Sequence, residues 1–172
     1  MTDAVSPSAG PLVQATNGDF YGATNGGDNN RGTTFKMTPS GKLTTLYNFC
    51  SQGSFPNCPD GASPTAGLVQ AVNGDFYGTT FGGGASDVCY GGCGTVFRIT
   101  RTGVLTTLYS FCSQSGCTDG ENPPAGLVHP TTGDLYGTTY YGGASLCPGG
   151  CGTVFSLSAG ALSSNVSFRV LP

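Results

Sequence analysis

Residues 67–80 read GLVQAVNGDFYGTT, and this stretch decides the fold. Short apolar segments flank an Asn-Gly pair, a pattern typical of two strands joined by a tight turn. A type I′ turn needs positive φ at both central residues, and we expect Asn73 and Gly74 to form one. The stretch returns as GPLVQATNGDFYGAT at 10–24 and as GLVHPTTGDLYGTT at 126–139. The chain therefore contains three copies of one unit.

Two further segments recur with the first. One is Gly-Thr-x-Phe, at 32–35, 94–97 and 152–155. The other is Leu-Thr-Thr-Leu-Tyr-x-Phe, at 43–49 and 105–111, with a degraded third version, LSSNVSF, at 162–168. Each copy therefore supplies four short strands, counting the two around the Asn-Gly turn.

The middle copy predicts which side chains share a face of each strand. In the third strand, one face carries Thr95, Phe97 and Ile99, and the other carries Val96 and Arg98. In the fourth strand, we expect a single face to carry Leu105, Thr107, Tyr109 and Phe111.

The repeat predicts an all-β fold. We expect a single repeat domain over residues 1–172, with repeats at about 10–66, 67–125 and 126–172. Four antiparallel strands in such a unit are typical of one propeller blade, so the prediction is a β-propeller-like array of three four-stranded antiparallel blades. The alternative is a β-trefoil, in which three four-stranded units close as a monomer.

Composition excludes several classes of protein. The 172 residues include 30 glycines and 11 prolines, but only 9% are charged and the net charge is −3. Six basic residues cannot build a surface that follows nucleic-acid phosphates, so no nucleic-acid partner is expected. No apolar run approaches the roughly 18 residues of a membrane-spanning helix.

The repeated motifs resemble the bacterial GloVer tandem repeat. The resemblance covers nearly the whole chain and rests on Gly-Leu, Asp-Phe-Tyr-Gly-Thr-Thr, Gly-Gly, Gly-Thr-Val-Phe and Leu-Thr-Thr-Leu-Tyr-x-Phe. It implies a propeller-like protein that is secreted or anchored at the cell surface. It implies no enzymatic chemistry for particular residues, and no cofactor is expected.

The eight cysteines also indicate an extracellular or cell-surface protein, because disulfides persist in oxidising compartments. Met1-Thr2-Asp3 lacks the basic and apolar regions of a secretion signal, so we expect the chain to be an excised piece.

The cysteines fall into four short-range pairs. Because they are gained and lost together between copies, we expect four local disulfides, Cys50–Cys58, Cys89–Cys93, Cys112–Cys117 and Cys147–Cys151. A thiolate zinc site is the alternative, but Cys-x3-Cys is not the usual zinc spacing, and no metal is expected. The single histidine, His129, is expected to be an ordinary strand residue.

Three polar positions recur once per copy, and we interpret them as structural. Asp would cap the turn, Tyr would pack in the core or between blades, and Thr would join strands by hydrogen bonds. These residues are Asp19, Asp75 and Asp134, then Tyr21, Tyr77 and Tyr136, then Thr24, Thr80 and Thr139.

The cysteine-bearing loops vary most between copies, and in a propeller they open on one face. Loops held by a rigid scaffold commonly carry binding residues. We expect them to expose aromatic side chains that stack on sugar rings, beside acids that hydrogen-bond to hydroxyls. The candidate binding residues are Phe81, Asp87, Tyr90, Tyr140 and Tyr141. Contacts between loops, or within an oligomer, would explain the aromatics equally well.

Binding, adhesion or scaffolding is therefore predicted, with a glycan as a candidate ligand. The alternative is a carbohydrate-active enzyme, similar to a glycoside hydrolase, that uses the loop carboxylates of Asp60, Asp119 and Glu121. Nothing in their spacing singles them out, and no nucleophile elbow is present in the sequence. No catalytic residue is assigned.

Three blades leave two apolar faces and two edges without a neighbour. We therefore expect either a homo-oligomer, as a closed ring or a filament, or further repeats in a longer parent chain.

Overall fold

The structure is a computed structural model that describes residues 10–27, 30–129, 133–144, 150–159 and 166–171. In these ranges the chain is all-β, apart from one 3-10 turn, η1 (Ser115–Cys117). No helix in them has the length and apolar character needed to cross a membrane.

The strands form three antiparallel sheets, each following the order of the sequence. The first contains β1 (Val13–Gln14), β2 (Phe20–Thr24), β3 (Thr33–Met37) and β4 (Leu43–Asn48). The second contains β5 (Val69–Gln70), β6 (Phe76–Thr80), β7 (Thr95–Ile99) and β8 (Leu105–Ser110). The third contains β9 (Asp134–Thr138), β10 (Val154–Ala159) and β11 (Val166–Val170).

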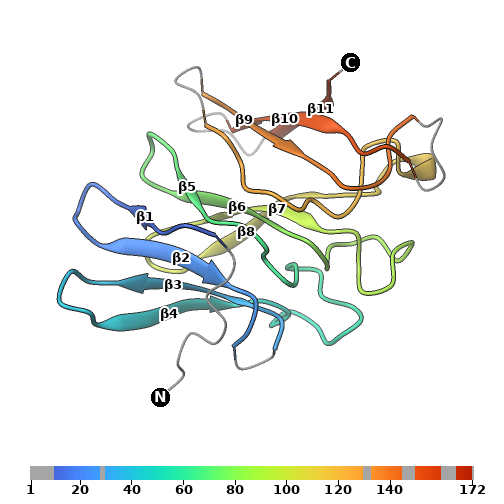
Figure 1. The fold of residues 1–172 in the computed structure, drawn as a ribbon. Coiled ribbons are helices and arrows are strands. Elements are labelled where there is room, and N and C mark those ends of the chain that lie inside the picture. The colour runs from blue at the N-terminus through green and yellow to red at the C-terminus, as the bar shows by residue number, and fades with distance from the viewer. Residues whose placement is uncertain (1–9, 28–29, 130–132, 145–149, 160–165, 172) are drawn as a thin grey trace.

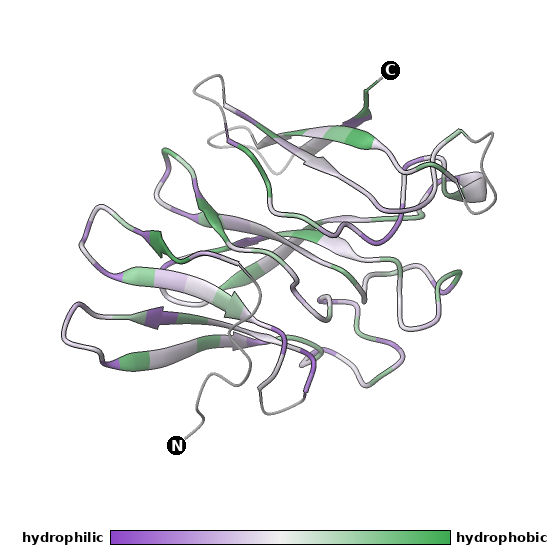
Figure 2. Cartoon of the chain, in the orientation of Figure 1, coloured by the Kyte–Doolittle hydropathy of each residue, from purple (hydrophilic) through white to green (hydrophobic). Residues whose placement is uncertain are grey.

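The three sheets stack face to face, with the second between the other two (Figure 1). Hydrophobic segments lie on strands of all three (Figure 2). One buried cluster joins the first and second sheets, and another joins the second and third. The predicted propeller-like array is confirmed, and the β-trefoil alternative is wrong.

The second and third sheets meet the preceding sheet through equivalent residues. An edge-to-face aromatic contact occurs at both junctions: Phe49 meets Phe97 and Phe111 meets Phe155, each with ring centroids 5.1 Å apart. The predicted packing role of the recurring tyrosine also holds at the first junction, where Tyr21 stacks on Phe76 at 4.0 Å. The repeated sequence thus produces a repeated interface.

The hairpin turn differs from the predicted type I′. Ala15 accepts a hydrogen bond from the Gly18 amide and its own amide donates to the Asp19 carbonyl, which makes a three-residue loop. Gly18 has a positive φ of 86°, whereas Asn17 does not. Asn17 instead accepts a side-chain hydrogen bond from the Asp19 amide, so asparagine stabilises the turn without entering the left-handed region.

The fourth strand does not keep its predicted apolar residues on one face. A register shift lies between Val96 and Phe97, where β7 pairs with β8. Leu105 packs toward the first sheet, while Tyr109 and Phe111 pack toward the third. One extra residue in a bulge reverses the alternation, and this one strand therefore serves both junctions.

The third sheet has three strands in the described residues, not the four predicted. A single bridge between Val128 and Tyr136 stands where β1 and β5 pair in the other sheets. The last strand also begins later than the degraded motif suggests. Phe168 lies opposite Leu157, as Leu105 lies opposite Ile99, so Phe168 takes the place of Leu105 and not of Phe111.

Buried threonine pairs connect β2 with β3 and β6 with β7, and a third pair lies at the adjoining ends of β9 and β10, as predicted. Their hydroxyl oxygens are 2.8 Å apart in the first two sheets and 2.9 Å in the third. The pairs are Thr24 with Thr33, Thr80 with Thr95, and Thr139 with Thr153.

The recurring aspartates are structural, but their carboxylates pair across the sheet as well as supporting the turn. Asp75 forms an ion pair with Arg98 at 2.7 Å. The Ser158 hydroxyl donates to Asp134 at 2.7 Å. These partners lie on the strand next to each aspartate.

Candidate ligand-binding site

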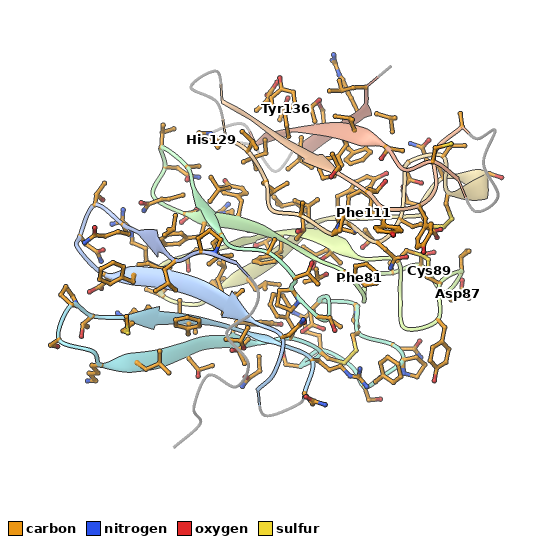
Figure 3. All side chains as sticks on the ribbon, viewed as in Figure 1. Phe81, Asp87, Cys89, Phe111, His129 and Tyr136 are labelled. Carbon is orange, nitrogen blue, oxygen red and sulfur yellow. A yellow bond between two sulfur atoms is a disulfide. The ribbon has the colours of Figure 1, made fainter. Side chains whose placement is uncertain are left out.

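One end of the stack is made of long loops, and we call it the loop end. It consists of the β2–β3, β6–β7 and β9–β10 loops and the segments that follow β4 and β8, on the right of Figure 1. Backbone bridges from Ala62 to Gly82 and from Glu121 to Tyr141 connect each segment to the loop of the next sheet. His129 lies at the opposite, hairpin end (Figure 3). We predicted that the loop between the second and third strands and the loop after the fourth strand open on one face, and this is confirmed.

Disulfides hold these loops. Cys50–Cys58, Cys89–Cys93 and Cys112–Cys117 are bonded as predicted. Cys151 is also disulfide-bonded, and Cys147, its predicted partner, lies outside the described residues. No described cysteine is free. Bridges across short loops chiefly reduce the freedom of the loop itself, so the loop end is a stiffened surface.

Sulfur and carboxylate atoms gather at one point of the loop end. Ligand atoms of Cys89, Cys93, Cys112 and Glu121 lie within 4.8 Å of one another. All three sulfurs are in disulfides and are not thiolates, which are the form that binds zinc. The group is therefore two adjacent disulfides beside a carboxyl.

The expectation that the loops expose Asp60 and Asp119 is wrong, because both side chains are fully buried. Asp119 accepts hydrogen bonds from the Tyr109 hydroxyl at 2.7 Å and from the amide and hydroxyl of Ser113 at 2.9 Å. Asp60 has the equivalent partners in the first repeat, Tyr47 and Ser51. Each carboxylate organises the cysteine loop after its sheet.

The tyrosine partners of these aspartates hold their protons strongly. Burial raises the pKa of the Tyr109 phenol to about 12, and the hydrogen bond to Asp119 and its charge act in the same direction. Burial likewise raises the pKa of Tyr47, and Asp60 acts in the same direction. Both phenols therefore remain donors to the buried carboxylates.

This shift predicts a loss of stability at alkaline pH. An unfolded tyrosine loses its proton near pH 10, so between about pH 10 and pH 12 the folded chain holds more protons than the unfolded chain. The free energy of unfolding must then fall as pH rises through this window. Tyr109→Phe should show a smaller drop in melting temperature between about pH 9 and pH 11 than wild type. Tyr140→Phe, at an exposed site, is the control, and equal drops in both variants would contradict the assignment.

One cleft, which we call the Asp87 cleft, lies between the segment after β4 and the β6–β7 loop. Its volume is about 340 Å³. Polar groups come from Asn57, Ser86 and Asp87, and an aromatic ring comes from Tyr90. Asp87 and Tyr90 were both predicted as binding residues, and the structure brings them together.

Tyr90 stands beside a second aromatic ring, Phe55, that was not among the predicted binding residues. Its side chain is 88% exposed, and its ring meets Phe55 edge to face at 5.6 Å. The Arg31 guanidinium lies 3.6 Å from the centre of the Phe55 ring, so Phe55 is supported from another loop. Phe55 could have been found, because the Cys50–Cys58 loop is longer than its counterpart Cys112–Cys117 and Phe55 lies in the extra length.

The other predicted binding residues lie elsewhere on the loop end. Tyr140 and Tyr141 are exposed and in edge-to-face contact at 4.6 Å on the β9–β10 loop. Phe81 is half-buried, and its backbone carbonyl accepts a hydrogen bond from the Asn122 side chain at 2.8 Å. Phe81 is therefore placed in the junction between repeats.

Glu121 borders a second cleft, of about 320 Å³, together with Val88 and the glycines of the third repeat. Burial raises the pKa of its carboxyl. One carboxyl oxygen lies 2.9 Å from the Cys89 sulfur. Of the three carboxylates considered for catalysis, Glu121 is the one that the structure places at a cleft.

Stacked antiparallel sheets with long loops at one end define a propeller-like repeat protein. The chain belongs to the family described as the Gloeobacter/Verrucomicrobia repeat, which matches residues 1–170. This confirms the resemblance found in the sequence. No curated protein is significantly similar to the chain.

A solved structure shares the fold. It is the X-ray structure of a protein described as a gluconolactonase, and it superposes with a TM-score of 0.59 at 13% sequence identity. The match covers 93% of this chain and 48% of the other, so the chain spans about half the length of that protein. At this identity the likeness concerns the propeller fold and not the activity.

Proposed function

We propose that the chain is a binding module of a secreted or cell-surface protein, and that its loop end binds neutral glycans. The observation that carries the proposal is the cleft at Asp87 and Tyr90. There, an almost fully exposed aromatic ring stands beside hydrogen-bonding groups on loops that disulfides stiffen.

The chemistry of the cleft suits a sugar ring. The face of an aromatic ring is electron-rich, and it attracts the C–H groups on the apolar face of a pyranose. Asp87 and Asn57 are exposed at the same cleft and can accept or donate hydrogen bonds at sugar hydroxyls. Loops already held in place lose little entropy when a ligand binds.

The disulfides support an oxidising compartment for this protein. Seven described cysteines are bonded, and such bonds persist outside the reducing cytosol. We propose an extracellular or cell-surface location on this ground together with the repeat family.

A glycan array probed with the intact chain tests the proposal, followed by titration of the best neutral oligosaccharide. Tyr90→Ala should weaken binding at least about tenfold, since exposed aromatic anchors contribute about 1.4–2 kcal/mol or more. Val72→Ala, at an exposed site on the hairpin end, is the matched control and should bind normally. Equal affinity of Tyr90→Ala and wild type for the oligosaccharide would show that the cleft at Tyr90 is not the binding site.

A carbohydrate-active enzyme is the second candidate, because Glu121 combines a raised pKa with a place at a cleft. A carboxyl with a raised pKa is the usual general acid of a glycosidase. The same oligosaccharides incubated with the chain should release no new reducing ends if the chain only binds. Turnover that Glu121→Gln abolishes would favour the enzyme instead.

A further inference from the structure

We infer that the outer faces of the first and third sheets bind each other between two copies of this chain, in a head-to-tail contact. The inference concerns the two faces of the stack. It does not depend on the glycan proposal, which concerns the loop end.

Both internal junctions use the same positions on the sheet that follows. The second sheet presents Leu68, Phe76, Phe97, Ile99 and Leu105 to the first. The third sheet presents Leu127, Leu135, Phe155, Leu157 and Phe168 to the second. The same positions of the first sheet form what we call the first outer face, which consists of Leu12, Phe20, Phe35, Met37 and Leu43.

The first outer face has the same local arrangement as its buried counterparts. A Cβ atom added to Gly22 would lie 2.7 Å from Leu12 and 2.8 Å from Phe35. A Cβ added to Gly78 would meet Leu68 and Phe97 at 2.9 and 2.7 Å. The glycine thus lets the leucine and phenylalanine close over the strand in both sheets, whether or not another sheet covers them.

Exposure distinguishes the free face from the covered ones. Leu12 is 45% exposed, whereas its counterparts Leu68 and Leu127 are 7% and 8% exposed. Phe20 and Met37 are half-buried where the equivalent positions in the other sheets are fully buried. Phe35 of this face is itself only 5% exposed. Within the described residues, no other sheet packs against the first outer face.

The third sheet carries the complementary face. Val128, Tyr136, Val154 and Leu171 form what we call the third outer face. Val128 pairs with Tyr136 as Val69 pairs with Tyr77. Tyr136 lies in the third sheet, at the top of Figure 3.

Here too the described side chains are more exposed than their counterparts between two sheets. Val154 is 49% exposed, whereas Val96, its counterpart in β7, is fully buried. Val128 is 65% exposed. Tyr136 is half-buried, whereas Tyr77 is only 3% exposed.

A second copy of the chain is the occupant that these faces fit. At each internal junction, the face of one sheet that corresponds to the third outer face packs against the face of the next sheet that corresponds to the first outer face. The two outer faces are therefore complementary to each other, and neither is complementary to itself. Such a contact is heterologous. Two copies also supply the length of a whole propeller, because one copy spans 48% of the solved one. Two head-to-tail contacts then close a ring of two copies.

Size measurements on two charge variants and their mixture test this inference. Leu12→Glu disables only the first outer face, and Val154→Glu disables only the third. Both sites are exposed within a single copy, so folding is retained. Val72→Glu, at a 90% exposed hairpin site, is the control.

Wild type and the control should sediment at about twice the 17.3 kDa of one chain. Each charge variant alone should remain at 17.3 kDa, because every head-to-tail contact then contains one charged face. An equal mixture should recover a one-to-one pair, joined through the two intact faces. A wild-type chain that stays monomeric over the concentration series, or a variant that assembles by itself, would overturn the inference. Glycan binding by a monomer would leave the binding proposal intact.

Discussion

Phe111→Ala is expected to lower the free energy of unfolding by about 3–5 kcal/mol, the range for removing a fully buried phenylalanine. Phe111 is inaccessible to solvent, and its ring meets Phe155 and Phe168 of the third sheet edge to face. Its removal leaves a cavity in the core that joins the second and third sheets. Urea unfolding with the disulfides intact measures the loss.

Phe49→Ala provides the matched comparison. Phe49 occupies the same position between the first and second sheets and is equally buried. If the two junctions are equivalent, both variants should lose stability to a similar extent. A loss below about 1 kcal/mol for either would mean that the junction does not rely on this ring.

Asp119→Ala is expected to lower the free energy of unfolding by about 3–5 kcal/mol. Hydrogen bonds to a charged acceptor contribute about 1.5–3 kcal/mol each, and the donors of Tyr109, Ser113 and Gln114 would lose their shared buried acceptor together. The cysteine loop after β8 should then loosen, which faster hydrogen exchange at Ser113 and Gln114 would report.

Asp87→Ala is the control for this variant, since Asp87 is exposed at the Asp87 cleft. It should change stability by less than about 0.5 kcal/mol, as surface substitutions usually do. Equal stability of Asp119→Ala and Asp87→Ala would contradict the structural role of the buried carboxylate.

The sequence contained enough information for the strands of the first two sheets and for the three disulfides whose cysteines are both described. The strand motifs recur in the three copies, so each strand prediction rests on more than one segment of sequence. Cysteines that are absent together from one copy are predicted to bond to each other in the copies that have them. The threonine pairs follow in the same way, since Thr80 and Thr95 recur with fixed neighbours and face each other once the strands pair.

Other features could not be predicted, because they depend on local geometry that the alternation of residues does not encode. The bulge near Phe97 reverses the faces of β8, so Leu105 and Phe111 serve different junctions. Phe168 resembles Phe111 in sequence but pairs at the position of Leu105, because the last strand starts later.

The candidate site could be predicted only in part from the sequence. Asp87 and Tyr90 were found because they lie in a loop that varies between copies. Asp119 was expected at the surface with them. The sequence of a polar loop does not reveal that its aspartate is buried and accepts hydrogen bonds within the protein. Phe55 reaches Tyr90 from another repeat, a contact that exists only when the sheets stack.

Amide chemical-shift mapping with the best neutral oligosaccharide tests most directly whether the loop end is the binding surface. If the loop end binds the glycan, shifts should concentrate at Asn57, Asp87 and Tyr90, with none at the hairpin-end residues Asn73 and His129. Shifts centred on the hairpin end would contradict it.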